Sequence, residues 1–243
     1  MAAKDYITDY LDRLQVNKVF TADLFVTDTF SRNTVRVALD RLVASGKIRK
    51  LDRGRYYKPK QTMFGEMEPE IEQVVGDLVE DKNHKLIGYL TGTIVFAQLG
   101  LTTQISSQIQ LGVRKYRRAV RRGSYVVTFI EQPNPITKES IELLRLLDAL
   151  RFVRDIPATT PNEAVERMLY LIGRLSEQKQ KRLVALALKY PPYVRALLGA
   201  IMEKNGADEV LVGRLRKSLN ELTTYRLHIA EEVLPTIGRW RIV

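Results

Sequence analysis

The first sixty residues combine three short helical patterns with two strand-like runs. Apolar residues recur at helical spacing over residues 5–14, and Thr21 can cap a second short helix over residues 21–25. Ser31 is a typical N-cap residue for a third helix that we expect to run to about Ser45. The next residue, Gly46, suits the left-handed conformation that ends many helices. The apolar positions of the third helix form one stripe: Val35, Ala38, Leu39, Leu42 and Val43.

A basic hairpin follows the third helix. Residues 47–51 alternate apolar and basic side chains as a strand does, and residues 52–54 (Asp-Arg-Gly) suit a tight turn. Residues 55–58 return as a second strand, which Pro59 ends. Three helices followed by a basic hairpin are typical of the winged helix-turn-helix, a DNA-binding fold. We therefore predict a DNA-binding domain of this kind over residues 1–60, with RNA binding by the same fold as the alternative.

The pattern changes between residues 61 and 135. Residues 61–84 predict an acidic linker that leads into a helix beginning near Pro69, and this segment either connects two regions or folds onto a basic surface. Residues 85–135 predict a small mixed α/β region, with one helix over residues 94–99 capped by Thr91 or Thr93. Three β-like runs follow that helix, over residues 104–111, 117–122 and 124–130.

From residue 136 to residue 243 the pattern predicts only helices. Thr160-Pro161-Asn162-Glu163 is a capping box, Ser176 can cap the next helix, and further helices are expected to begin at Pro192 and Asp208. The last of these is expected to be long, and its apolar residues could form either a core-facing stripe or a dimer seam: Leu215, Leu219, Leu222, Ile229 and Val233. Trp240 is expected to be a packing anchor. The predicted fold class is therefore α+β.

Charge is unevenly distributed along a chain whose net charge is +11. Residues 31–60 contain ten Lys or Arg and two Asp, whereas residues 61–82 contain seven acidic residues and one Lys. Residues 83–130 contain seven Lys or Arg and no acidic residue. Two basic blocks on either side of an acidic segment suggest a polyanionic partner, most often a nucleic acid.

The polar face of the third helix and the hairpin supply the candidate DNA contacts. Asn can form two hydrogen bonds with adenine, Arg can do the same with guanine, and an aliphatic side chain can touch the thymine methyl group. The candidates are Ser31, Arg32, Asn33, Thr34, Arg36, Val37, Arg41, Lys47, Arg49, Lys50, Arg53, Arg55 and Lys58. We also predict a second basic surface, which either binds phosphate or is a charged strand edge that opposes aggregation. Its residues are Arg114, Lys115, Arg117, Arg118, Arg121 and Arg122.

Catalytic chemistry has little support in the sequence. With no cysteine and only two histidines, His84 and His228, thiolate sites and multi-histidine metal sites are excluded. No GxxxxGK[ST] or GxGxxG motif occurs, so nucleotide binding has no motif to carry it. We expect no enzymatic activity, no cofactor and no metal. No apolar run is long enough to span a membrane and no signal peptide is recognised, so we expect a cytoplasmic protein without a membrane partner.

Three strings, taken in order, resemble one known family. They are FSRNTVRVALDRLVASGKI at residues 30–48 with RGRYY at residues 53–57; YLTG at residues 89–92 with QLGLTTQ at residues 98–104; and LVALALKYPPYVRALLGA at residues 183–200. In this order they resemble the AbiEi family, the transcriptional-regulator antitoxins of type IV toxin–antitoxin and abortive-infection systems. The resemblance spans about residues 5–203.

The resemblance implies a repressor that binds its own operator. The partner would be double-stranded DNA with inverted repeats, contacted by Asn33, Thr34, Arg36, Arg53 and Arg55, and a homodimer on DNA is compatible with such repeats. Residues 85–243 would together form the antitoxin domain, which counteracts a nucleotidyltransferase-like toxin without a stable complex. Two alternatives remain open: a ligand-responsive winged-helix transcription factor without a toxin partner, and a nucleic-acid-modifying enzyme.

Overall fold

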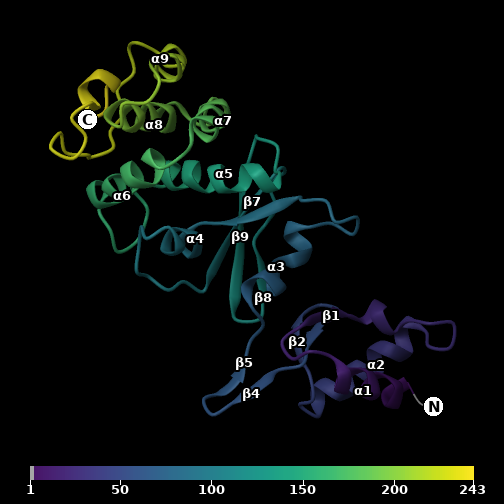
Figure 1. Cartoon of the computed structure of the whole chain (residues 1–243). Coiled ribbons are helices and arrows are strands. Elements are labelled where there is room, and N and C mark those ends of the chain that lie inside the picture. Colours follow the sequence, from purple (N-terminus) through teal and green to yellow (C-terminus); the bar gives the residue numbers. More distant parts are fainter. Residues whose placement is uncertain (1–2) are drawn as a thin grey trace. The chain divides into compact units, whose positions relative to one another are not determined.

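The computed structural model describes residues 3–243, which fall into two compact units (Figure 1). Of these residues, unit 1 contains 3–78 and 120–126, and unit 2 contains 79–119 and 127–243. Both helices and sheets are present, which confirms the predicted α+β class. Within the described residues, no helix combines the length and the apolar character needed to cross a membrane.

Unit 1 begins with most of the elements expected for the first sixty residues, together with one strand that was not expected. Helix α1 (Ala3–Arg13), strand β1 (Val19–Thr21), the 3-10 helix η1 (Ala22–Phe25) and helix α2 (Arg32–Ala44) precede the hairpin of β2 (Arg49–Asp52) and β3 (Arg55–Tyr57). The second predicted helix is thus only a short 3-10 turn, and β1 was not predicted. Strand β1 joins the hairpin in an antiparallel sheet of order β1-β3-β2. The two longer helices and the sheet enclose an apolar core that includes Ile7, Phe25, Leu39, Leu42 and Ile48.

The acidic segment is more structured than a plain connector. A second hairpin, β4 (Lys60–Thr62) and β5 (Gly65–Met67), precedes helix α3 (Ile71–Val79). The chain returns to unit 1 at β8 (Val120–Arg122), where the amide of Gly123 donates to the carbonyl of Leu51 at 2.9 Å. Unit 1 is therefore assembled from two separate stretches of sequence.

Unit 2 combines strands with a group of helices. Strand β6 (Gly88–Thr91), helix α4 (Thr93–Gln98), β7 (Gln108–Val113) and most of β9 (Tyr125–Glu131) come first, and these strands are ordered β6-β7-β9. Five helices follow, and in Figure 1 they gather beyond β7: α5 (Lys138–Arg151), α6 (Pro161–Gly173), α7 (Glu177–Ala187), α8 (Pro192–Lys204) and α9 (Glu209–Lys217). The predicted caps at Thr160, Ser176 and Asp208 are confirmed.

The prediction of one long final helix was wrong. Helix α9 ends at Lys217, and the following residues form an irregular tail with one short 3-10 helix, η2 (Ile237–Trp240). The tail docks onto α8 through Trp240, as expected for a packing anchor, because Gly199 leaves room for the indole ring. A dimer seam on one helical face is therefore not formed, since its residues do not share a helix.

A buried polar network lies in the core of unit 2. The carboxylate of Asp148 is fully buried and accepts hydrogen bonds from the hydroxyls of Tyr89 (2.7 Å), Thr91 (2.9 Å) and Tyr190 (2.8 Å). The side-chain amide of Gln132 donates to both tyrosine hydroxyls. Neither predicted cap serves α4, whose N-cap residue is Gly92: the hydroxyl of Thr91 donates to Asp148, and Thr93 is already the first residue of the helix.

Candidate nucleic-acid interface

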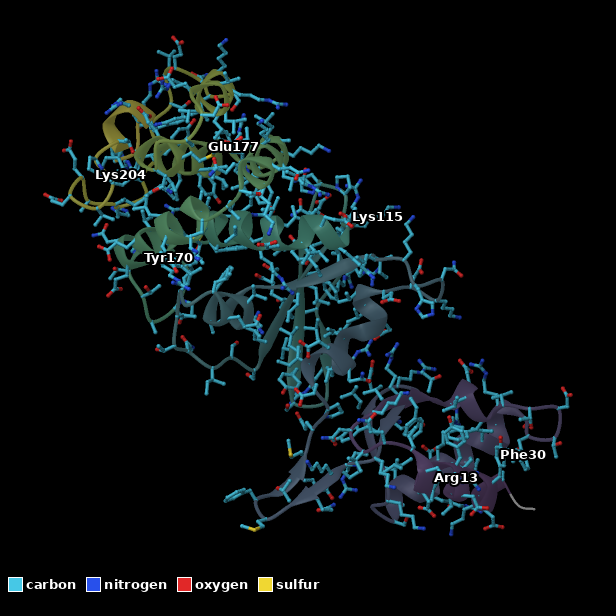
Figure 2. The ribbon with its side chains drawn as sticks, viewed as in Figure 1. Arg13, Phe30, Lys115, Tyr170, Glu177 and Lys204 are labelled. Atoms are coloured by element: carbon cyan, nitrogen blue, oxygen red, sulfur yellow. The ribbon has the colours of Figure 1, made fainter. Side chains whose placement is uncertain are left out.

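Helix α2 presents a polar face because its apolar face is buried. Val35, Ala38, Leu39 and Leu42 are buried in unit 1, so the residues between them point away from the core. The exposed residues at the helix start and on this face are Ser31, Arg32, Asn33, Thr34, Arg36, Val37 and Arg41. All seven were predicted from the sequence, and they lie directly after Phe30, which is labelled in Figure 2.

The start of α2 is fixed by its cap. The hydroxyl oxygen of Ser31 accepts from the backbone amide of Thr34 at 3.3 Å, and the two hydroxyls are 2.9 Å apart. Capping satisfies one of the orphan amides of the first helical turn. The first turn is thus held in place without using the side chains of Asn33 or Arg36.

The side chains of α2 differ in the partners they have. Arg32 forms an exposed ion pair with Asp23 at 2.6 Å. By contrast, the side chains of Asn33, Arg36 and Arg41 form no hydrogen bond or ion pair within residues 3–243. These three polar groups are exposed and remain available to a partner.

The basic hairpin divides into free and engaged cations. Lys47, Lys50 and Arg53 are exposed, and Arg53 occupies the turn beside Gly54, whose φ is +75°. Positive φ at this position favours glycine because it lacks a Cβ. Across the described chain none of the three cations has an ion pair, so the hairpin keeps uncompensated positive charge at its turn.

Three predicted contact residues of the hairpin are engaged within unit 1. Arg49 binds the carboxylate of Glu66 through two hydrogen bonds of 2.7 and 2.6 Å, and Arg55 forms an ion pair with Asp77. Burial lowers the pKa of Arg55, although Asp77 acts in the opposite direction. The ammonium of Lys58 donates to the carbonyl of Leu11 at 3.0 Å.

The predicted second basic surface is only partly a surface. Arg122 is 6% exposed and lies 3.2 Å from the carboxylate of Asp52 and 3.1 Å from that of Asp77. Burial of a guanidinium is tolerated here because two carboxylates neutralise it. The prediction that Arg122 is a surface residue was therefore wrong.

The other five cations of that group are exposed but belong to different units. Arg121 lies in unit 1, whereas the segment after β7 in unit 2 carries the rest: Arg114, Lys115, Arg117 and Arg118. Arg114 donates to the carbonyl of Pro133 at 2.6 Å, and Lys115 is labelled in Figure 2. Residues 114–119 form no strand, so the expected strand is reduced to Val120–Arg122.

Sequence reasoning did not identify Glu66 and Asp77 as partners of the hairpin. The available signal was the opposite charge of the neighbouring segments, since an acidic stretch directly follows a basic one. His84 and His228 are both exposed and have positive φ, and the ring of His84 lies 2.6 Å from the carboxylate of Glu80. Among residues 3–243 no group of three or more His, Asp or Glu is arranged to hold a metal ion.

The fold and this surface define an α+β protein with an exposed polar helix face beside a basic hairpin. The chain belongs to the family of unknown function DUF6088, whose model matches residues 6–153. Its fold is similar to that of the Rv2827c protein from Mycobacterium tuberculosis, known from a crystal structure. That comparison covers 94% of this chain and 85% of the other, with a TM-score of 0.54 and 15% identity. No curated protein matches this chain.

Proposed function

We propose that unit 1 is a winged helix-turn-helix that binds double-stranded DNA, and that the protein represses its own operon. The observation that carries this proposal is the exposed face of α2, where the side chains of Asn33, Arg36 and Arg41 form no hydrogen bond or ion pair within the described residues. In this arrangement α2 lies in the major groove, with Asn33 and Arg36 near its N-terminal end reading base edges. The fold similarity and the basic charge of residues 31–60 are compatible with this function.

The hairpin contributes phosphate contacts through its free cations. Lys50 and Arg53 neutralise phosphates beside the groove and release counterions, which makes binding depend on salt. Three other cations of the hairpin already have intramolecular partners: Arg49, Arg55 and Lys58. We therefore propose that they mainly hold the hairpin in place.

We further propose that unit 2 carries the antitoxin activity implied by the resemblance to the AbiEi family. It would counteract a nucleotidyltransferase-like toxin without forming a stable complex. Co-expression with a nucleotidyltransferase encoded beside this gene tests the idea. A full chain with substituted α2 contact residues that still restores growth supports the idea. If the unsubstituted full chain does not reduce the toxicity, the idea is contradicted.

The DNA proposal is tested by fluorescence anisotropy with the promoter of the protein's own gene and a shuffled duplex. We expect Arg36→Gln to weaken promoter binding by about 1–3 kcal/mol and to affect the shuffled duplex much less. Arg53→Gln should weaken both and reduce the salt slope by about 1. Arg13→Gln, an exposed arginine on α1, is the matched control and should change neither. An absence of promoter binding at low salt contradicts the proposal.

A ligand-responsive regulator without a toxin partner is the second candidate. It is favoured by one observation, a pocket of 410 Å³ in unit 2 lined mainly by apolar side chains. Volumes of about 300–1,000 Å³ are usual for small-molecule sites. The two candidates separate in the co-expression assay, because only an antitoxin relieves the toxin.

A further inference from the structure

The pocket in unit 2 lies between the end of α4, the first half of α5 and the end of α6. Its apolar lining is Val95, Leu99, Ile141, Leu146, Leu171 and Leu175. Val95 is 1% exposed and Leu146 is 4% exposed, so the floor of the pocket reaches the core of the unit. The other four apolar residues are half-buried and form its walls. A small molecule entering this pocket would contact a largely apolar surface.

Charge is concentrated at the rim of the pocket. Lys138 and Arg145 line it together with Gln98 and one acidic residue, Glu142. The carboxylate of Glu142 is held 2.6 Å from the ammonium of Lys179, which reduces its repulsion of an anion. Lys138 is exposed and forms no ion pair within residues 3–243.

Arg145 is hydrogen-bonded to the backbone beside the pocket. Its Nε donates to the carbonyl of Leu90 at 3.0 Å, which anchors the guanidinium at the pocket. A second pocket of 410 Å³ shares Glu142, Leu171 and Leu175 with the first and adds Arg174. Cations therefore outnumber acidic groups in the combined lining of the two pockets. The electrostatic potential there favours an anionic ligand.

We propose that this pocket binds a small amphipathic anion. The apolar body of the ligand lies against the leucine and isoleucine side chains, and its carboxylate or sulfonate group lies at Lys138 and Arg145. The first pocket is lined by ten residues. A standard protein–protein interface uses about 20–30 residues on each side, so the size of the site favours a small molecule over a protein partner.

This inference rests on unit 2 alone and does not depend on DNA binding by unit 1. A small amphipathic anion is the class of ligand that a ligand-responsive regulator would bind. The same pocket would bind it if the protein is an antitoxin. Failure of the DNA experiment therefore leaves this inference standing, and failure of the ligand experiment leaves the DNA proposal standing.

The experiment uses the full chain and the fluorescent anion 1-anilinonaphthalene-8-sulfonate as the probe, with octanoate and 1-octanol as competitors. We expect one probe per chain, displaced more effectively by octanoate than by 1-octanol. Lys138→Gln should weaken probe binding about fivefold, the upper range for one exposed ion pair. Leu171→Phe, which fills the pocket, should weaken it at least as much.

Two matched controls lie outside the pocket. Lys204→Gln removes an exposed lysine at the end of α8, and Leu222→Phe alters a leucine that is 94% exposed; neither should change the affinity. Circular dichroism verifies that the variants fold, and Lys138 is exposed enough for its substitution to leave the fold intact. Unchanged affinity in Lys138→Gln, equal competition by octanoate and 1-octanol, or equal losses in the control variants would overturn the proposal.

Discussion

Replacing Thr91 with valine removes one hydrogen bond from the buried network around Asp148. Valine has nearly the same shape as threonine, and the hydroxyl of Thr91 donates to the Asp148 carboxylate at 2.9 Å. Tyr89 and Tyr190 keep their own bonds to the same carboxylate. A hydrogen bond to a charged group contributes about 1.5–3 kcal/mol, so we expect a loss of that size in the free energy of unfolding at pH 8.

The loss should depend on pH because Asp148 titrates. Burial raises the pKa of Asp148 from 3.8 to about 6, although its three hydroxyl partners act in the opposite direction. The folded pKa lies above the unfolded value, so the contribution of Asp148 to stability is complete below pH 3.8 and lost as pH rises through 6. Over this pH range the contribution of Asp148 to the free energy of unfolding decreases by about 3 kcal/mol.

Thr91→Val removes a bond that favours the charged form, so it should raise the pKa of Asp148 further. At pH 5 the folded carboxyl is mostly protonated, and the lost bond is then between neutral groups, worth about 0.5–1.5 kcal/mol. The cost of the substitution should therefore be smaller at pH 5 than at pH 8. Urea unfolding followed by the fluorescence of Trp240, the single tryptophan, measures both values in unit 2.

The matched control is Thr103→Val, at an exposed threonine of the same unit whose side chain has no hydrogen bond within residues 3–243. It should change the free energy of unfolding by less than about 0.5 kcal/mol at either pH. A cost for Thr91→Val that is the same at pH 5 and pH 8, or below 0.5 kcal/mol at pH 8, would refute the reasoning.

Three further predictions concern packing and capping. In Gly199→Ala the new Cβ would lie 2.1 Å from the Trp240 ring, so we expect a loss of about 1–3 kcal/mol and a shift in tryptophan emission; Gly213→Ala, where a Cβ meets nothing within 4 Å, should not destabilise. Arg122→Ala removes a buried partner of Asp52 and Asp77, but Asp77 keeps Arg55 and both carboxylates are partly exposed, so it should cost about 1–3 kcal/mol in urea unfolding, whereas Arg121→Ala should cost less than about 0.5. Ser31→Ala removes the cap of α2 and should cost about 1 kcal/mol, with faster amide exchange at Thr34; unchanged exchange would contradict the role of the cap.

Local sequence signals predicted those elements whose structure is decided locally. The N-cap at Ser31, the capping box at Thr160 and the apolar stripe of α2 depend on residues three or four positions apart, and all of them are present. Strand β6 and the tail after Lys217 were missed, because each depends on distant partners. Tyr225, for example, pairs with Ile242, and the tail is held by Trp240 on α8 rather than by helical hydrogen bonds.

The candidate interface was predictable by residue type but not by partner. Helical periodicity correctly separated the exposed face of α2 from its buried face. The same reasoning could not distinguish Arg53, which is exposed and free of ion pairs within the described chain, from Arg55 and Arg122, which share Asp77. Such pairings join residues far apart in the sequence, so only the folded backbone reveals which cations are already neutralised.

The return of the chain to unit 1 at residues 120–126 constrains how this protein can be divided or recombined. A gene fusion that transfers only residues 1–84 would omit strand β8, which includes Arg122. The transferred fragment would then lack the buried guanidinium that pairs with Asp52. We therefore expect the two units to be inherited together, because neither unit is encoded by one continuous stretch that could be exchanged by itself.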